Sequence, residues 1–163
     1  MTDHPTDLSP PQLQFAFRIL LRFDNGPRLR FAPAGKAGLR GHVAVQGGEI
    51  SGPRLTGHVV PLSGGDWPRF WPGGLVEFEA HYQLQADDGT PIYIHNSGIA
   101  WHSPEVLARI EAGLPTSPDD TYCRVTPRFE APAGPHEWLN HTVFVGKGER
   151  RGDHSVFDYY IVT

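Results

Sequence analysis

An acidic residue and two tryptophans share the segment GGDWPRFWPGG at residues 64–74, where Gly and Pro fill six of the eleven positions. Because Gly and Pro disfavour regular structure, we expect a loop here. Large aromatic side chains in a loop must pack back onto the fold, so we expect Trp67 and Trp71 to cover one end of it. Asp66 would then be partly removed from water, which favours its protonated form unless Arg or backbone N–H groups keep it ionised.

Two interpretations of Asp66 stay open. In the functional one, its carboxyl group exchanges protons with a ligand, or binds a hydroxyl group, at the mouth of a pocket. In the structural one, it accepts hydrogen bonds from backbone N–H groups of its own loop in an Asx-type turn.

Histidine is frequent in this chain, with nine residues in 163. Metal-binding patterns such as His-x-His or His-Glu-x-x-His do not occur. His136 and His141 flank EWLN at a spacing that places them on opposite faces of a strand. We therefore predict no metal site.

Other short motifs predict no function. NHT at 140–142 matches a glycosylation sequon, GKGER at 146–150 lacks the spacing of a phosphate-binding loop, and RGD at 151–153 is a three-residue coincidence. Cys123 lies among bulky neighbours and is expected to be a buried small hydrophobe rather than a nucleophile. As the one cysteine of the chain, it forms no intramolecular disulfide and fits a reducing compartment.

The elements that must position these groups are mostly strands, because apolar and polar residues alternate with a period of two. The pattern is sharpest at 12–23, where the apolar face comprises Leu13, Phe15, Phe17, Ile19, Leu21 and Phe23. Further strands are predicted at 42–50, 54–61, 75–85, 91–101, 121–129, 138–146 and 156–163. One short helix is predicted at 103–111, with Ser103 as N-cap, Pro104 in the first turn and Gly113 after its end.

Strand-sized segments separated by turns predict an all-β, mainly antiparallel sandwich or barrel. The 19 Gly and 16 Pro are explained by tight turns, and the chain is long enough for one core. We expect a single domain at 12–163 after a flexible lead-in at 1–11. The formal net charge of −4 and the lack of a basic patch argue against a nucleic-acid partner. With neither a signal-peptide pattern nor a long apolar run, we expect a cytoplasmic protein without a membrane partner.

Four stretches carry a resemblance to a known family: GGEISGPRLTGHVVPLSGGDW, AHYQLQADDGTPIYIHNSG, YCRVTPRFEAP and WLNHTVFVGKGER. They occur in family order from about residue 12 to the C-terminus, and the chain resembles the family DUF3237, also called UPF0311. The resemblance implies a closed, calycin-like antiparallel β-barrel. Carried over by motif, the implied site positions are Asp66, Trp67, Tyr82, Asn96, Arg124, Trp138 and Asn140. His81 stands where we expect a basic residue in the family, which leaves specificity at that position in doubt.

The implied positions suggest a chemistry. Arg124 shares one face of the strand 121–129 with other polar residues, and this face points either to a ligand or to solvent. Asp66, Tyr82 and Arg124 together would support proton transfer beside a stabilised oxyanion, without a cofactor. Such a site suits an isomerase, lyase or dehydratase acting on a small aromatic or carbonyl acid.

Two alternatives stay open beside this ligand-binding barrel. One is a non-catalytic carrier of a small apolar acid, and the other is a structural or homo-oligomeric module with a filled barrel. Both ligand hypotheses predict a cavity of at least ~300 Å³ lined by Tyr82, Arg124 and a tryptophan. A filled barrel predicts Arg124 at the surface.

Overall fold

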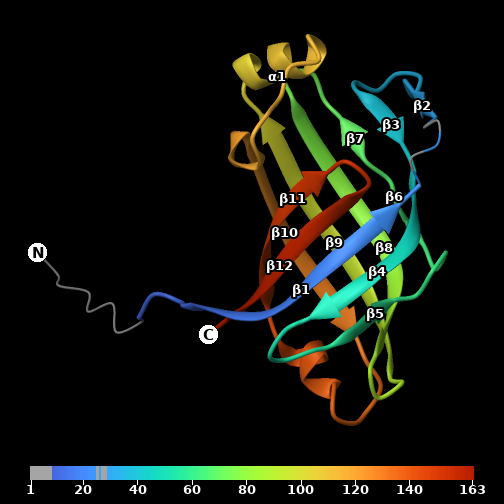
Figure 1. The fold of residues 1–163 in the computed structure, drawn as a ribbon, viewed down its shortest axis with the longest axis vertical. Helices are drawn as coiled ribbons and strands as arrows, with labels where there is room; N and C mark the ends of the chain where they lie inside the picture. Colours follow the sequence, from blue (N-terminus) through green and yellow to red (C-terminus); the bar gives the residue numbers. More distant parts are fainter. Residues whose placement is uncertain (1–8, 25, 27–28) are drawn as a thin grey trace, which may run out of the picture.

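A computed structural model of the chain describes residues 9–24, 26 and 29–163 and shows a β-barrel (Figure 1). Its strands are β1 (Leu13–Phe23), β2 (Arg30–Phe31), β3 (Leu39–Gly41), β4 (Val43–Ser51), β5 (Gly57–Val59), β6 (Gly65–Asp66), β7 (Arg69–Phe70), β8 (Leu75–Ala86), β9 (Pro91–His102), β10 (Thr121–Glu130), β11 (Phe144–Arg151) and β12 (His154–Val162). The helical segments are α1 (Pro104–Glu111) and the 3-10 turns η1 (Pro118–Asp120) and η2 (Glu137–His141).

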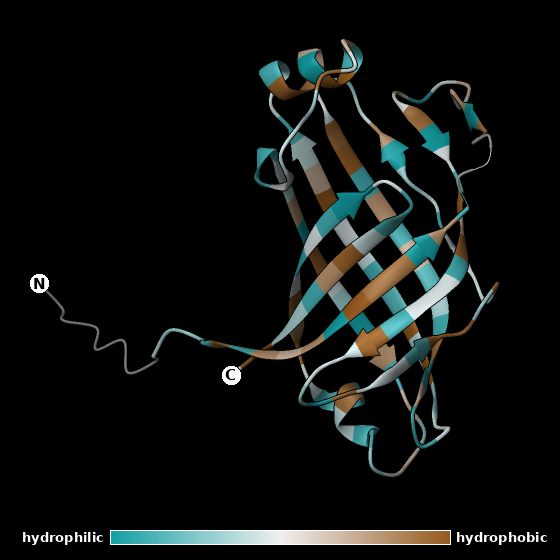
Figure 2. Cartoon of the chain, in the orientation of Figure 1, coloured by the Kyte–Doolittle hydropathy of each residue, from teal (hydrophilic) through white to brown (hydrophobic). Residues whose placement is uncertain are grey.

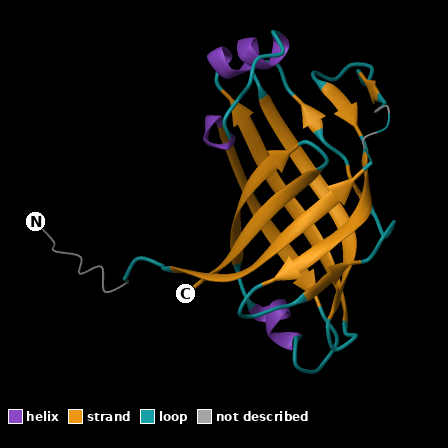
Figure 3. Ribbon diagram, in the orientation of Figure 1, coloured by secondary structure: helices purple, strands orange, loops and turns teal. Residues whose placement is uncertain are grey.

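The sheet closes on itself through antiparallel pairs. Its order runs β8-β5-β4-β1-β12-β11-β10-β9, and β9 pairs again with β8 to complete an eight-stranded barrel (Figure 3). The short β6 lies beside β5 in the ring, between β4 and β8, while β7, β3 and β2 extend from β8. The prediction of an all-β, closed antiparallel barrel is therefore confirmed.

The two ends of the barrel differ. Helix α1 and the extension made by β2, β3 and β7 lie at one end, and η2 lies at the other (Figure 1). We call these the α1 end and the η2 end. Helix α1 spans the predicted residues, and the Ser103 hydroxyl accepts a hydrogen bond from the Val106 N–H at its N-terminus.

The η2 half of the barrel interior is filled with aromatic side chains. The rings of Phe17, Phe129, Phe144 and Tyr159 lie with centroids 5.0 to 6.1 Å apart, and Trp138 of η2 packs on Phe144. Apolar positions (brown) alternate with polar or neutral ones (teal and white) along the strands, as expected for a barrel whose inner face is apolar and whose outer face contacts solvent (Figure 2). This half of the barrel is a packed core.

Strand β1 departs from the predicted alternation at its start. Its pairing with β12 shifts register between Phe15 and Phe17, so Ala16 and Phe17 are both fully buried. A bulge of this kind reverses which face the earlier residues occupy. Leu13 and Phe15 are consequently exposed, against the prediction that they share the buried face with Phe17.

Two predicted segments have a different structure. Residues 64–74 are only partly a loop, because they carry the two-residue strands β6 and β7. Gly64 allows the close approach to β8, since a Cβ there would overlap the carbonyl oxygen of His81. Residues 138–146 are not one strand, because 137–141 form η2 before β11 begins at Phe144. Most of the lead-in predicted at 1–11 lies outside the described residues. Within the described ranges, no helix is long and apolar enough to cross a membrane.

Candidate ligand cavity

The α1 half of the barrel interior holds a cavity of about 450 Å³. Most of its wall is apolar, contributed by strands on every side of the barrel and by the β7 extension. The apolar lining comprises Leu21, Phe23, Val43, Val45, Pro68, Phe70, Val76, Phe78, Ala80, Ala100, Ile110 and Phe157. A concave, mostly apolar site of this size is typical of small-molecule pockets.

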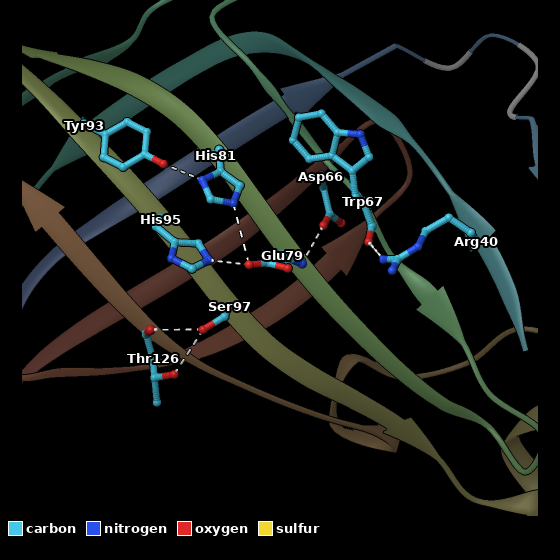
Figure 4. A network of polar contacts seen from close by, with 9 residues as sticks. All are labelled: Arg40, Asp66, Trp67, Glu79, His81, Tyr93, His95, Ser97 and Thr126. Atoms are coloured by element: carbon cyan, nitrogen blue, oxygen red, sulfur yellow. Dashed lines mark hydrogen bonds and ion pairs between the residues drawn. The ribbon is translucent and has the colours of Figure 1, made fainter. Parts of the chain in front are cut away.

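Asp66 and Asn96 supply polar groups on one wall. Asp66 of β6 pairs with Ala80 of β8, and Ala80 pairs with Asn96 of β9, so the three residues form one cross-strand row. Paired residues point to the same face of a sheet, and all three line the cavity. The Asp66 carboxylate also accepts a hydrogen bond from the Glu79 N–H at 3.1 Å (Figure 4).

Asn96 is the more deeply placed of the two polar residues. It is 1% exposed, and its side-chain oxygen has no hydrogen-bond partner among the described residues. An unsatisfied buried polar group is costly, and native structures keep few of them. This oxygen is therefore a candidate acceptor for a polar hydrogen of a ligand.

His102 lies further along the same wall of β9, toward the α1 end. Its Nδ1 is 3.1 Å from the Thr121 hydroxyl oxygen, and both residues line the cavity. Partial burial lowers the pKa of His102 below its ordinary value, because removal from water disfavours the charged ring. The imidazole is therefore neutral near pH 7 and able to accept a proton.

Cys123 of β10 also lines the cavity. Burial raises the pKa of its thiol to about 11, and the nearby positive charge of Arg124 offsets only part of this effect. The group is thus a protonated, weakly polar thiol at neutral pH. It is not an activated nucleophile, which agrees with the prediction of a small buried residue.

Two guanidinium groups lie at the α1-end rim of the cavity. Arg30 of β2 lies over the Phe70 ring at 4.0 Å, and Arg150 of β11 lies over the Phe23 ring at 3.8 Å. All four residues line the cavity. Cation–π contacts hold both side chains against the rim, where they are able to attract an anionic ligand.

Tyr82, a predicted site residue, lies deeper in the barrel than the cavity. It follows Ala80 by two positions on β8 and is 1% exposed, and neither its hydroxyl nor that of Tyr159 makes a hydrogen bond of ordinary geometry among the described residues. Burial raises the pKa of both tyrosines far above the usual value, and each hydroxyl lies close enough to affect the other. Tyr82 belongs to the core beneath the cavity.

Arg124 and Trp67 face away from the cavity. Arg124 lies on the exposed face of β10, where its guanidinium donates to the Cys123 carbonyl oxygen at 2.8 Å and lies over the Tyr122 ring. Trp67 follows the inward-facing Asp66 and so points outward, with 41% of its surface exposed. The predicted cavity lining by Arg124 and a tryptophan is therefore wrong, because strand alternation turns both side chains outward.

Trp138 and Asn140 lie at the η2 end, opposite the cavity. The Asn140 carboxamide accepts from the Ala131 N–H and donates to the Ala131 carbonyl oxygen, both at 2.8 Å. Trp138 packs against the core and lies under the Arg54 guanidinium at 4.5 Å. Both residues hold the η2 turn against the barrel, and the described cavity lies at the other end.

Sequence reasoning missed His102, although its signal was available. Positions 92, 94, 96, 98, 100 and 102 share one face of β9, so the alternation that places Asn96 inside also places His102 inside. Ser155, a buried polar residue on β12, also lines the cavity and was not selected. The sequence motifs drew attention to particular residue types, whereas the alternation along each strand determines which residues point into the barrel.

The family model of DUF3237, described as a protein of unknown function, matches residues 11–162. The chain belongs to the DUF3237 family. A UPF0311 protein from Rhodopseudomonas palustris (strain TIE-1) is 35% identical over 125 residues, which cover 77% of this chain and 81% of that relative. The resemblance of the four sequence stretches is thereby confirmed.

Solved structures of two relatives share the fold over almost their whole length. A conserved protein of unknown function from Rhodopseudomonas palustris matches with a TM-score of 0.85 and 32% identity, covering 96% of this chain and 100% of that one. A β-barrel-like protein from Acinetobacter baumannii matches with a TM-score of 0.83 and 29% identity, covering 97% and 99%. These solved structures support the closed barrel architecture, and the function must be argued from the cavity itself.

Proposed function

We propose that this protein binds a small aromatic or carbonyl-bearing acid in the cavity at the α1 end. The observation that carries this proposal is an apolar cavity of about 450 Å³ whose wall holds a buried, unpartnered side-chain oxygen, that of Asn96. Apolar walls suit a ring, and the Asn96 side-chain oxygen, a hydrogen-bond acceptor, suits a hydroxyl group. The rim guanidinium groups of Arg30 and Arg150 suit a carboxylate.

A second candidate is acid–base catalysis in the same cavity, and the neutral imidazole of His102 favours it. His102 would take a proton from the bound molecule, while the Asn96 side-chain N–H would donate a hydrogen bond to the oxygen on which negative charge develops. Enolisation next to a carbonyl, as in an isomerase or dehydratase, has these requirements. Asp66 would then position a ligand hydroxyl, since its carboxylate is already held by the Glu79 N–H.

The test of ligand binding starts with native mass spectrometry of freshly purified protein, compared with its denatured mass. Where no extra mass is found, benzoate, salicylate and phenylpyruvate serve as probes, detected by changes in the protein's NMR spectrum. The decisive variant is Ala100→Phe, because Ala100 lines the cavity and a ring there fills it. The matched control is Ile99→Phe on the outer face of the same strand, where the side chain is 41% exposed.

Binding that survives Ile99→Phe and is lost in Ala100→Phe supports the proposal. Binding unchanged in Ala100→Phe, or no probe bound by the native chain, overturns it. Catalysis is tested separately with His102→Gln, which keeps a polar side chain but removes the titrating ring. A carrier retains its function in this variant, whereas an enzyme loses turnover and still binds.

A further inference from the structure

We propose that Glu79, His81 and His95 form a site for one divalent transition-metal ion on the outer face of the β8–β9 hairpin. The three side chains offer ligand atoms that all lie within 4.8 Å of one another. They point away from the barrel interior and form a compact group in Figure 4. The site is separate from the proposed function in the cavity.

Strand pairing creates this cluster. Glu79 and His81 are two positions apart on β8, so they share one face, and His95 of β9 is the direct partner of His81. Because the third ligand comes from another strand, spacing along the chain does not reveal the group. This explains why the sequence predicted no metal site.

The distances between the ligand atoms are close to those expected around one metal ion. The Glu79 Oε1 lies 3.0 Å from Nε2 of His95 and 3.7 Å from Nε2 of His81. Ligand atoms about 2.0–2.2 Å from a tetrahedral zinc ion lie roughly 3.3–3.6 Å from one another. All three side chains are partly exposed, with 32% to 58% of their surface accessible, so they have room to close around an ion that enters from solvent.

The two imidazole rings are already oriented alike. Their planes differ by 9° and their centroids are 4.2 Å apart, so the rings are stacked and their Nε2 lone pairs run nearly parallel. Both Nε2 atoms lie within 4 Å of the Glu79 carboxylate, and the rings must rotate for the lone pairs to converge on one ion. The Tyr93 hydroxyl hydrogen-bonds Nδ1 of His81 on the far side of that ring. A second hydrogen bond to the remaining ring nitrogen is the usual support of a metal-binding histidine.

The ligand set points to a borderline metal. Two imidazoles and one carboxylate suit Zn²⁺, Ni²⁺, Co²⁺ or Fe²⁺ better than Mg²⁺ or Ca²⁺, which prefer oxygen ligands alone. Trp67 lies against this group, with its ring centroid 6.1 Å from that of His81. Its fluorescence therefore reports on an ion bound there.

The experiment is a titration of tag-free protein with Zn²⁺ by isothermal calorimetry, and with Ni²⁺ by tryptophan fluorescence. We expect one ion per chain, with affinity reduced at least tenfold in Glu79→Gln, His81→Gln and His95→Gln. Tyr93→Phe tests the supporting hydrogen bond, with an expected loss of about tenfold in affinity. The control is His141→Gln, because His141 forms an exposed pair with Glu137 at 3.9 Å and should leave affinity unchanged.

Circular dichroism without metal checks that every variant keeps its fold. The proposal is overturned if fewer than one ion binds per chain or if His95→Gln binds Zn²⁺ as tightly as the native protein. It is also overturned if His141→Gln loses as much affinity as the variants of the three ligands. Trp67→Phe adds a further criterion. This variant should lose the fluorescence response to Ni²⁺, while its Zn²⁺ affinity by calorimetry should stay within twofold of that of the native protein. A fluorescence response that persists would mean that the ion binds elsewhere.

Discussion

Asp66 of β6 and Asn96 of β9 face one cavity from either side of Ala80 on β8. Adjacent strands lie about 4.8 Å apart, so their backbones are separated by roughly 10 Å with only a methyl group between them. A flat ligand placed over Ala80 would therefore reach a carboxylate at one edge and a carboxamide at the other. The two polar groups would therefore fix the orientation of a bound ligand within the cavity.

Replacing Asn96 with Leu should stabilise the protein while removing ligand binding. Its unpartnered oxygen is buried, and an apolar side chain of similar shape removes the cost of desolvating it, about 1–3 kcal/mol. Urea unfolding of the ligand-free protein measures the first effect, and titration with the probes of the proposed function measures the second. A destabilised variant would mean that a partner satisfies the carboxamide in solution.

Asn140→Leu should have the opposite effect on stability. Here the carboxamide makes two hydrogen bonds of 2.8 Å to the Ala131 backbone, and both are lost. Because these groups are near solvent, we expect a loss of about 1 kcal/mol in the free energy of unfolding, with ligand affinity unchanged. Urea unfolding beside Asn96→Leu gives a direct contrast between two Asn-to-Leu changes. Loss of binding in Asn140→Leu would instead return this residue to the functional site.

The sequence predicted the main strands and the helix because their signals are local. Alternation over 75–86 and 91–102 and the Ser103 cap depend on neighbouring residues alone. The strands β6 and β7 within 64–74 were missed because the Gly content of this segment suggests a loop, whereas Gly64 is needed for close contact with β8. Such a contact depends on the partner strand.

The candidate site was predicted only in part, for a related reason. Asp66 and Asn96 line the cavity as predicted, whereas Arg124 faces outward because its neighbours on β10, Cys123 and Val125, face inward. Deciding which face of a strand is inside requires its register with neighbours. The type of a residue alone does not show whether its side chain points into or out of the barrel.

Cys123 should react slowly with thiol reagents in the folded protein. With its pKa raised to about 11, roughly one thiol in a thousand is ionised at pH 8. The rate of reaction with iodoacetamide should therefore rise about tenfold per pH unit from 8 to 10, and approach that of an ordinary cysteine in urea. Mass spectrometry of quenched samples gives the rate. Rapid alkylation at pH 7 in the native protein would show an activated thiolate instead.

His102 should make the protein less stable as the pH falls below about 6.5. Burial lowers its folded-state pKa below the ordinary histidine value of about 6.5, so the unfolded chain binds more protons in this range. Since stability rises with pH wherever the unfolded state binds more protons, stability is full above 6.5 and declines on acidification toward the folded pKa. Unfolding free energies at pH 7 and pH 5 should differ less in His102→Gln than in the native sequence. An equal difference in both proteins would contradict the assignment.

Gly98→Ala should destabilise the barrel, because this position has no space for a methyl group. A Cβ at Gly98 would overlap the carbonyl oxygen of Arg124 and lie 2.7 Å from Cγ1 of Val125, so β9 and β10 would have to separate locally. Overpacking of this kind costs about 1–3 kcal/mol. Gly152→Ala is the matched control, since nothing lies within 4 Å of its added Cβ. Urea unfolding should give a clear loss for Gly98→Ala and almost none for Gly152→Ala. Equal stability of the two variants would mean that β9 and β10 are less closely paired than this structure describes. The cavity wall that carries Asn96 would then also be less rigid.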